Sequence, residues 1–501
     1  MMAKDSAKNL NSLLEQVSQL REAVYQEGTE LFQKWEKDID RKEFLLSARD
    51  LAYYLALRRR DIRNIQMELT PLGLSSLGRL ESRTLNNLDA VLTSLSIIAG
   101  KESEWSYPSY ESFIAGQEQL TKNTRQLFGN KPESRHTRIM VTMPSEAAKD
   151  DQLIQLLIRN GMNVARINCA HDDAEIWKEM VGRIRKIAEN EQADVKVLMD
   201  IAGPKIRTGW VFTTLKKPKV KPGDKWYLAK NWEDLPHKNE TKVTAGCSIS
   251  EIFKTLEVGD QVLYDDGTIE SEVEEVTDGG SVLRVKKTRT GKSVRIKAEK
   301  GLNFPKSQFD LEMLTEQDKK DMGFAIEYAD IMGLSFVKDA EDIKKVQTEL
   351  ISQTDIKRAT EIPLMAKIET IQAVENLPAI IMTAAGKNPF SVMIARGDLA
   401  VEIGYSRLAE LQQEIMWICE AADIPVVWGT EVLDNMISSG IPTRAEVTDA
   451  AEGDRAECVM LNKGDYLTDG VAFLSEILKK MQEHQYKKTS RLRALNIAKD
   501  K

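Results

Sequence analysis

Two kinds of hydrophobic spacing divide the chain. Between Leu10 and Leu127, apolar residues recur every three or four positions, as in LLEQVSQLREAV and FLLSARDLAYYLALRRRDIRNIQMEL. This period places apolar side chains on one face of a helix. Pro71 and Gly73 interrupt the pattern, and the polar stretches KESEWSYPSYES and GNKPESRH follow it. The spacing predicts an all-α N-terminal extension over residues 1–135.

From residue 136 onward, short β-branched runs alternate with helical patterns. The eight runs are 138–143, 163–169, 195–201, 329–337, 363–369, 390–396, 425–431 and 458–463. Continuous apolar strands, each followed by a helix, are typical of a buried parallel sheet. Eight such units predict an α/β fold with a closed (β/α)8 TIM barrel over 136–209 and 300–485. A basic tail is expected over 486–501.

The third and fourth runs are too far apart for a single crossover helix. The intervening sequence contains VKPGDKWYLAKNW and LEVGDQVLYDDGTIESEVEEV, in which strand-like runs alternate with turn residues. Residues 210–299 are therefore predicted to form an inserted all-β domain. Ordinary hairpin turns explain its GDQVLYDDG segment, and a lid over the barrel is the functional interpretation.

Composition excludes several classes of protein. The 501 residues include 70 Lys and Arg against 78 Asp and Glu, a net charge of −8, which disfavours a nucleic-acid-binding protein. Four scattered cysteines without a CxxC pair, and only four histidines, argue against a disulfide scaffold or a zinc site. No apolar run has the length of a signal peptide or membrane span, so we expect a cytoplasmic protein without a membrane partner.

Polar residues follow the apolar part of five predicted strands. In a (β/α)8 barrel the reacting groups lie at the carboxyl ends of the strands, so these side chains are expected on one rim. They are Arg166, Asn168, Asp200, Lys367, Glu369, Arg396, Asp398, Thr430 and Glu431.

The segment LMAKIE carries the clearest chemical signal. Lys367 and Glu369 are two positions apart and face the same way, and a Lys within an apolar strand is costly to bury without a partner. Taken alone, these two residues are explained equally well by a structural ion pair. Asp398, at the end of the next predicted strand, adds a second carboxylate at the same level of the barrel and favours a functional site. Two carboxylates suit Mg²⁺, and a nearby Lys would neutralise a transferring phosphoryl group. Arg166 adds a planar fork for phosphate.

Several ordered motifs together resemble those of the pyruvate kinase family. They are MNVARINCAH, DIAGPKIRTG, KGLNFP, AKIE, MIARGDLAVEI, GTEVLDNM and PTRAE. The resemblance covers about residues 137 to 480, roughly two-thirds of the chain. Each motif alone is weak, whereas their joint order is very specific. The resemblance implies phosphoryl transfer from phosphoenolpyruvate to ADP, yielding pyruvate and ATP.

By this resemblance, Lys367 is the central catalytic residue, Arg166 holds the transferring phosphate, and Thr430 lies where the enolate is protonated. Glu369 and Asp398 would bind Mg²⁺ or Mn²⁺. The substrate site implied comprises Arg166, Lys367, Gly397, Asp398 and Thr430, with the backbone around Arg396 receiving the substrate carboxylate. The nucleotide site implied comprises Asn168, His171, Arg207, Lys300 and Asp266, the last approaching when the insert closes and excludes water.

One departure from the family pattern concerns monovalent cations. Relatives that depend on potassium have a Ser and a Glu where this chain has Ala170 and Lys205. The Lys205 ammonium would supply the charge that K⁺ otherwise provides, so K⁺ is predicted not to be required. The alternative is that Lys205 is simply a solvated surface residue.

Other departures leave the acceptor open. The loops TMPSEA and LNKGDYL differ from the family on the nucleotide side, and Glu431 stands where the family has Gln. We expect no counterpart of the family's C-terminal effector domain. Three hypotheses therefore stand: a pyruvate kinase-like phosphotransferase using ADP, transfer to another acceptor, and a catalytically weak sensor acting through residues 1–135. A homo-oligomer, such as a dimer, is expected.

Overall fold

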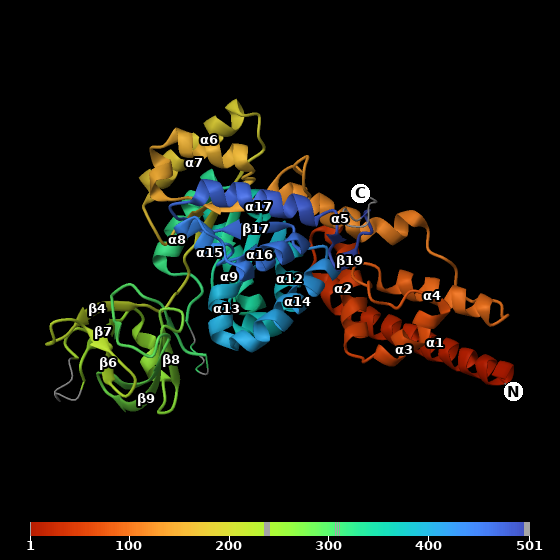
Figure 1. Cartoon of the computed structure of the whole chain (residues 1–501), viewed down its shortest axis with the longest axis horizontal. Helices are drawn as coiled ribbons and strands as arrows, with labels where there is room; N and C mark the ends of the chain where they lie inside the picture. The colour runs from red at the N-terminus through yellow and green to blue at the C-terminus, as the bar shows by residue number, and fades with distance from the viewer. Residues whose placement is uncertain (1, 235–240, 306, 308, 310, 495–501) are drawn as a thin grey trace, which may run out of the picture.

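The computed structural model describes residues 2–234, 241–305, 307, 309 and 311–494, and the end of the predicted basic tail, 495–501, lies outside them (Figure 1). The described chain consists of a helical N-terminal region, a barrel and a β-rich insert that projects from the barrel's side (Figure 1). None of the described helices combines the length and apolarity needed to cross a membrane.

The N-terminal region is helical, as its hydrophobic period predicts. Its α-helices are α1 (Met2–Trp35), α2 (Leu45–Arg58), α3 (Arg63–Leu69), α4 (Thr84–Ile98) and α5 (Tyr110–Phe128). The long helix α1 packs on α2 and α4. At the end of α5, Leu127 and Phe128 are buried with apolar residues of the barrel strands, including Met140 and Met460. The helical region is thus joined to the barrel through a continuous apolar core.

Eight parallel strands close into a barrel, which confirms the predicted fold class. In chain order they are β1 (Arg138–Thr142), β2 (Val164–Asn168), β3 (Lys196–Ile201), β13 (Ile331–Leu334), β14 (Leu364–Ile368), β15 (Phe390–Ala395), β16 (Val426–Gly429) and β17 (Cys458–Leu461). Each pairs with its neighbours in this order, and β17 pairs with β1. The strands are almost entirely buried because helices cover the outside of the barrel.

Helices cover the outside of the barrel between successive strands. They are α6 (Asp151–Asn160), α7 (Ala174–Asn190), α8 (Glu316–Tyr328), α9 (Ala340–Gln353), α10 (Ile356–Glu361), α11 (Ile371–Glu375), α12 (Leu377–Ala385), α13 (Arg396–Ile403), α14 (Tyr405–Ala421), α15 (Asp434–Ser439), α16 (Arg444–Glu452) and α17 (Leu467–Met481). Thr315 and Thr443 begin α8 and α16 with capping boxes, which satisfy backbone amides at the helix starts.

The insert between β3 and β13 has a sheet and an apolar core of its own. Its main sheet has the strand order β12-β8-β9-β10-β6-β7-β4. The strands are β4 (Thr208–Phe212), β6 (Lys225–Ala229), β7 (Thr244–Cys247), β8 (Gln261–Tyr264), β9 (Ile269–Thr277), β10 (Gly280–Thr288) and β12 (Leu302–Asn303). A smaller pair joins β5 (Lys219–Val220) to β11 (Val294–Arg295). Trp226 and Tyr264 pack edge to face within its core.

The segment predicted to begin a basic tail is instead part of a hairpin. Strands β18 (Gln485–Tyr486) and β19 (Thr489–Ser490) flank Lys487, which is 6% exposed. Its ammonium pairs with the buried carboxylate of Glu457, just before β17. This C-terminal hairpin is therefore anchored beneath the barrel, which charge composition alone does not reveal.

A buried carboxyl near the start of β1 gives a prediction about stability. Asp454 is 1% exposed, and its Oδ1 accepts a hydrogen bond from the Thr137 hydroxyl at 3.2 Å. Burial raises the pKa of Asp454 to about 7, although Thr137, Arg491 and Lys487 oppose this. The folded state therefore holds the proton more tightly, and the free energy of unfolding falls as pH rises from about 4 to 7.

The variant Asp454→Asn keeps a neutral group at this position at every pH. We expect it to lose this part of the pH dependence and to exceed the wild type in stability by roughly 2–4 kcal/mol at pH 8, but not at pH 4. Urea unfolding at the two pH values measures the difference. An equal effect of the substitution at both values would contradict the assignment.

Candidate active site

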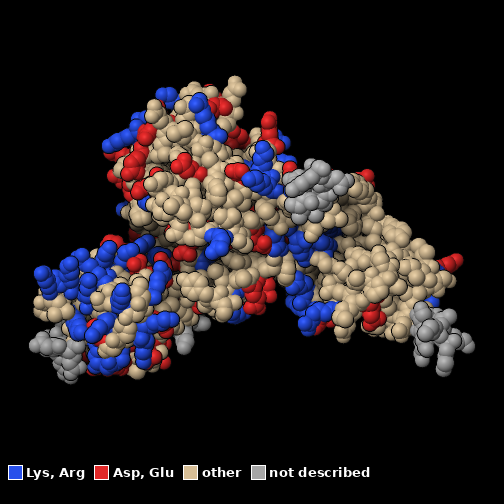
Figure 2. Space-filling model, in the orientation of Figure 1, with Lys and Arg blue, Asp and Glu red and all other residues tan. Residues whose placement is uncertain are grey.

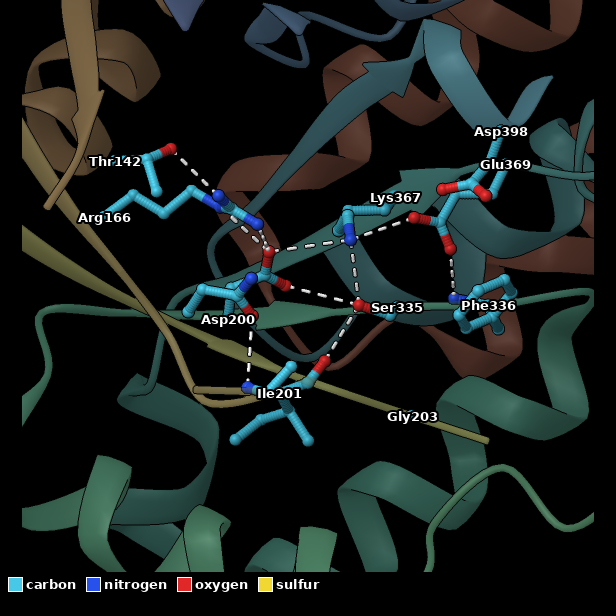
Figure 3. A network of polar contacts seen from close by, with 12 residues as sticks. Thr142, Arg166, Asp200, Ile201, Gly203, Ser335, Phe336, Lys367, Glu369 and Asp398 are labelled. Atoms are coloured by element: carbon cyan, nitrogen blue, oxygen red, sulfur yellow. Dashed lines mark hydrogen bonds and ion pairs between the residues drawn. The ribbon is translucent and has the colours of Figure 1, made fainter. Parts of the chain in front are cut away.

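A network of buried charges lies at the carboxyl ends of β2, β3 and β14 (Figure 3). Arg166 of β2 binds the Oδ2 atom of Asp200 on β3 through Nε at 2.9 Å and Nη2 at 2.5 Å. Its Nη1 donates to the Thr142 hydroxyl of β1 at 2.9 Å. With the guanidinium held by both adjacent strands, Arg166 has a fixed direction before any substrate binds.

Lys367 stands between two carboxylates in this network (Figure 3). Its Nζ is 2.9 Å from Glu369 Oε1, 3.5 Å from Asp200 Oδ2, and donates to the Ser335 hydroxyl at 2.9 Å. Burial lowers the pKa of the Lys367 ammonium, but the charges of Asp200 and Glu369 outweigh burial and raise that pKa. Lys367 is therefore a fixed positive charge at the barrel mouth.

Glu369 and Asp398 form a pair of carboxylates beside this ammonium (Figure 3). The second oxygen of Glu369, Oε2, accepts the backbone N–H of Phe336 at 2.7 Å. Burial raises the pKa of Glu369, Lys367 opposes this, and the negative charge of Asp398 adds to it. Repulsion between these carboxylates is what a divalent cation would relieve.

The donor set fits Mg²⁺. Mg²⁺ is usually bound through one or two carboxylates and keeps water or substrate oxygens in its other positions. Within the described ranges, no group of three His, Cys, Asp or Glu side chains forms a complete metal cage. Glu369 and Asp398 therefore suit a cation that a substrate phosphate helps to hold, and not a structural metal.

Lys205 reaches one of these two carboxylates, Asp398. Its Nζ lies 2.8 Å from Asp398 Oδ1, and its side chain is 22% exposed. It also lies over the ring of Phe336, 5.7 Å from the centroid. A freely solvated surface side chain would not have these contacts, so the structure favours the interpretation of Lys205 as a fixed charge in the site.

The loops after β15 and β16 hold each other in position. The Gly397 N–H donates to Thr430 Oγ1 at 2.7 Å, while Arg396 donates to the carbonyl oxygens of Gly429 and Thr430, both at 2.7 Å. Thr430 and Glu431 both have left-handed backbone conformations, with φ of 56° and 58°. Non-glycine residues rarely adopt this conformation because it is strained, and such strain is typical of functional loops. The Thr430 hydroxyl is thereby placed next to the first turn of α13.

The predicted nucleotide residues are divided between two places. Asn168 and His171 line a cavity of about 210 Å³ together with Arg166 and Lys463. The Lys463 ammonium comes from the short loop after β17. This cavity combines cationic groups with open volume next to Arg166, as an acceptor phosphate requires.

The other three predicted nucleotide residues belong to the insert or its hinge. Lys300 pairs with Asp265 at 2.9 Å, and Arg207 donates to the Glu299 carbonyl at 3.1 Å. Burial raises the pKa of Asp266, and the charge of Asp398 adds to it. Asp266 of the insert thus interacts electrostatically with the barrel's carboxylates, whereas Lys300 and Arg207 contact the insert's own loops.

Comparison with known proteins gives a consistent result. Residues 134–471 match the family model described as the pyruvate kinase barrel domain. This chain belongs to the pyruvate kinase family. The pyruvate kinase of Thermotoga maritima is 31% identical over 359 residues, which are 70% of this chain and 72% of the relative. That of Clostridium perfringens is 32% identical over 355 residues, covering 69% and 70%. That of Thermococcus litoralis is 33% identical over 370 residues, covering 70% and 71%.

The match to the pyruvate kinase family does not include the five helices α1 to α5 or the C-terminal hairpin. Within the matched part, the structure gives contacts to Asp200, which sequence reasoning placed on the rim without a role, and to Ser335, which it did not select. Asp200 bridges Arg166 and Lys367, and Ser335 accepts from Lys367. The position of Asp200 near the end of a predicted strand indicated that it lies on the rim of the barrel. Ser335 follows β13 without any charge to mark it.

Proposed function

We propose that this pyruvate kinase family member catalyses Mg²⁺-dependent phosphoryl transfer from phosphoenolpyruvate to ADP, giving pyruvate and ATP. The observation that carries the proposal is the Lys367 ammonium, held at 2.9 Å from Glu369 beside the second carboxylate, Asp398. A buried cation next to two carboxylates is suited to a substrate whose charge moves from a phosphate to an enolate oxygen.

Each side chain of the site has a separate role in the proposed phosphoryl transfer. Arg166 binds the transferring phosphate, and Lys367 stabilises the negative charge on that phosphate and on the enolate oxygen as the C–O–P link breaks. Glu369 and Asp398 would hold Mg²⁺, which withdraws charge from the same oxygens when bound. The acceptor's terminal phosphate oxygen forms the new bond to phosphorus. The enolate carbon then takes a proton on the side of Thr430, whose hydroxyl is fixed by Gly397.

The insert supports the same reaction by excluding water. Asp266, in the turn between β8 and β9, experiences the charge of Asp398, which is consistent with an insert that closes over the barrel mouth. Excluding water protects the phosphoryl group from hydrolysis.

The proposal is tested by measuring pyruvate formed from phosphoenolpyruvate with ADP and Mg²⁺. Pyruvate formation that requires all three supports it, and none above the background without protein overturns it.

We also propose that the reaction does not require K⁺. The support is the 2.8 Å contact between Lys205 and Asp398, which places a permanent positive charge at the carboxylates. In Lys205→Met, we expect kcat in K⁺-free buffer to fall by roughly ten- to a hundredfold, because this charge is lost. Lys217→Met, an exposed position on the insert, is the matched control. Wild-type turnover that depends on K⁺ would contradict the role of Lys205.

A different acceptor is the second candidate, and the cavity beside Arg166 is the observation that favours it. Lys463 enters this cavity from a loop shorter than the family pattern, so the acceptor site differs from that of a usual pyruvate kinase. Phosphoenolpyruvate consumption is compared with ADP, other nucleoside diphosphates and inorganic phosphate as acceptors. Preference for ADP by more than tenfold in kcat/KM supports ADP, since that ratio corresponds to about 1.4 kcal/mol.

A further inference from the structure

A second cavity, of about 350 Å³, lies where the helical region, barrel helix α14 and the C-terminal hairpin meet. Figure 2 shows Lys and Arg side chains gathered in the hollow between the barrel and the helical region. We call this space the junction cavity and define it by Arg58, Arg60, Arg63, Glu81, Trp417 and Lys488. None of these residues belongs to the candidate active site.

A buried hydrogen-bonded chain forms the wall of the junction cavity. The Glu81 side chain is 1% exposed and pairs with Lys488 Nζ at 2.5 Å. Its Oε1 accepts from the hydroxyl of Tyr54 at 3.1 Å, and that hydroxyl accepts from Arg58 Nη1 at 2.6 Å. Residues from α2, the loop before α4 and the C-terminal hairpin are thereby fixed relative to one another. The wall is preorganised and is not a set of freely moving surface side chains.

The aromatic surface in this cavity is already covered. Arg58 Cζ lies 4.7 Å and Lys488 Nζ 4.8 Å from the centroid of the Trp417 ring. Both cations gain from the negative face of the indole. A ligand entering the cavity therefore meets cationic groups instead of an open aromatic face, which disfavours an apolar ligand.

The lining also has an excess of positive charge. Four of its side chains are Arg or Lys, and two, Asp61 and Glu81, are carboxylates. Arg60 also pairs with Glu27 from outside the lining, so the surplus is one positive charge. Arg63 pairs with Asp61 at 2.5 Å, but within the described part of the chain Arg58 forms no ion pair. A guanidinium has five N–H donors, and Arg58 uses one on Tyr54. Its remaining donors are suited to an anion.

We propose that the junction cavity binds a small phosphorylated metabolite, with the phosphate held by Arg58, Arg63 and Lys488. Phosphate matches the planar fork of Arg and gains a charge-assisted hydrogen bond from each donor. The volume is at the lower end of the roughly 300–1,000 Å³ of small-molecule sites, which suits a compact metabolite and excludes a nucleic acid or folded partner. The inference does not depend on the proposed function, since it concerns binding and requires no turnover.

Occupation of this cavity has a structural consequence. Its walls come from three segments that are distant in sequence, and α14 lies between helix α13, which carries Asp398, and strand β16, which precedes Thr430. A bound phosphate links the helical region, α14 and the hairpin, and stabilises their docking. The ligand should therefore raise the midpoint of thermal unfolding as well as bind.

The test is isothermal titration calorimetry of the full chain with glycerol 3-phosphate, in buffer with EDTA so that no divalent metal supports binding at the active site. Glycerol is the uncharged control. We expect Arg58→Gln to weaken binding by about tenfold or more, as loss of a charge-assisted hydrogen bond predicts. Arg63→Gln, with an 82% exposed side chain that leaves the fold undisturbed, should weaken it several-fold.

Arg59→Gln is the matched control because Arg59 is next in sequence, loses the same charge and does not line the cavity. It should bind glycerol 3-phosphate as the wild type does. Three results would overturn the proposal: no binding by the wild type at millimolar ligand, equal binding by Arg58→Gln, or equal weakening by Arg59→Gln. The second would place the phosphate elsewhere, and the third would indicate only diffuse surface attraction.

Discussion

Lys367→Met is expected to reduce kcat for pyruvate formation by roughly 10²- to 10³-fold, the cost of losing one preorganised charge in a buried site. Methionine keeps most of the side-chain volume but leaves the oxygens of Asp200 and Glu369 without their shared cation. Charge developing on the phosphoryl group and the enolate oxygen would then be opposed by two carboxylates. A coupled assay of pyruvate release at saturating phosphoenolpyruvate, ADP and Mg²⁺ measures the loss.

Lys196→Met is the control for this experiment. Lys196 begins β3 at the opposite end of the barrel and pairs with Asp194 at 3.1 Å, so the same chemical change is made far from the mouth. It should retain nearly the full kcat. Thermal melts of both variants separate catalysis from folding. A Lys367→Met protein that is folded and still turns over at the wild-type rate would exclude Lys367 as the catalytic residue.

The barrel was predictable from the sequence because its strands are buried on both faces. A strand such as VKVLMDI, from 195 to 201, has to be apolar throughout, and a helix must follow it to cover the sheet. The same logic separates the N-terminal region, where helical period persists from Leu10 to Leu127. The C-terminal hairpin was missed because its strands are only two residues long and two lysines form the turn between them, while the burial of Lys487 depends on a partner 30 residues away.

The site residues followed from their position at strand ends, but their pairing did not. Arg166 and Asp200 meet because β2 and β3 are neighbours in the closed sheet, at a register that places Asn168 opposite Asp200. Lys205 was predicted as a compensating charge, yet its contact with Asp398 spans 193 positions and depends on how the β3 loop lies over α13. Sequence pattern identifies the end of a strand, whereas only the closed barrel determines which ends touch.

The largest stability effect is expected from the buried ion pair beneath the barrel. Lys487 and Glu457 are 6% and 8% exposed, and Glu457 Oε2 also accepts the backbone N–H of Val426 at 2.9 Å. Lys487→Met leaves Glu457 as a buried charge without its cation, and it removes a nearby positive charge from Glu420, which keeps its ion pair with Arg79. Removing one partner of such a pair costs about 3–5 kcal/mol, which urea unfolding with the wild-type slope would report.

The double variant Lys487→Met/Glu457→Gln distinguishes a charge effect from loss of packing. Glutamine keeps an oxygen for the Val426 amide but carries no charge, so the double variant should recover much of the stability lost by Lys487→Met alone. Lys480→Met is the matched surface control, because its ion pair with Glu476 is 71% and 61% exposed and should contribute less than about 1 kcal/mol. If Lys487→Met were no more destabilising than Lys480→Met, the hairpin would not be anchored by this pair. Lys488, the next residue, lines the junction cavity and pairs with Glu81. Such a result would therefore mean that the position of Lys488 in the cavity does not depend on the Lys487–Glu457 pair.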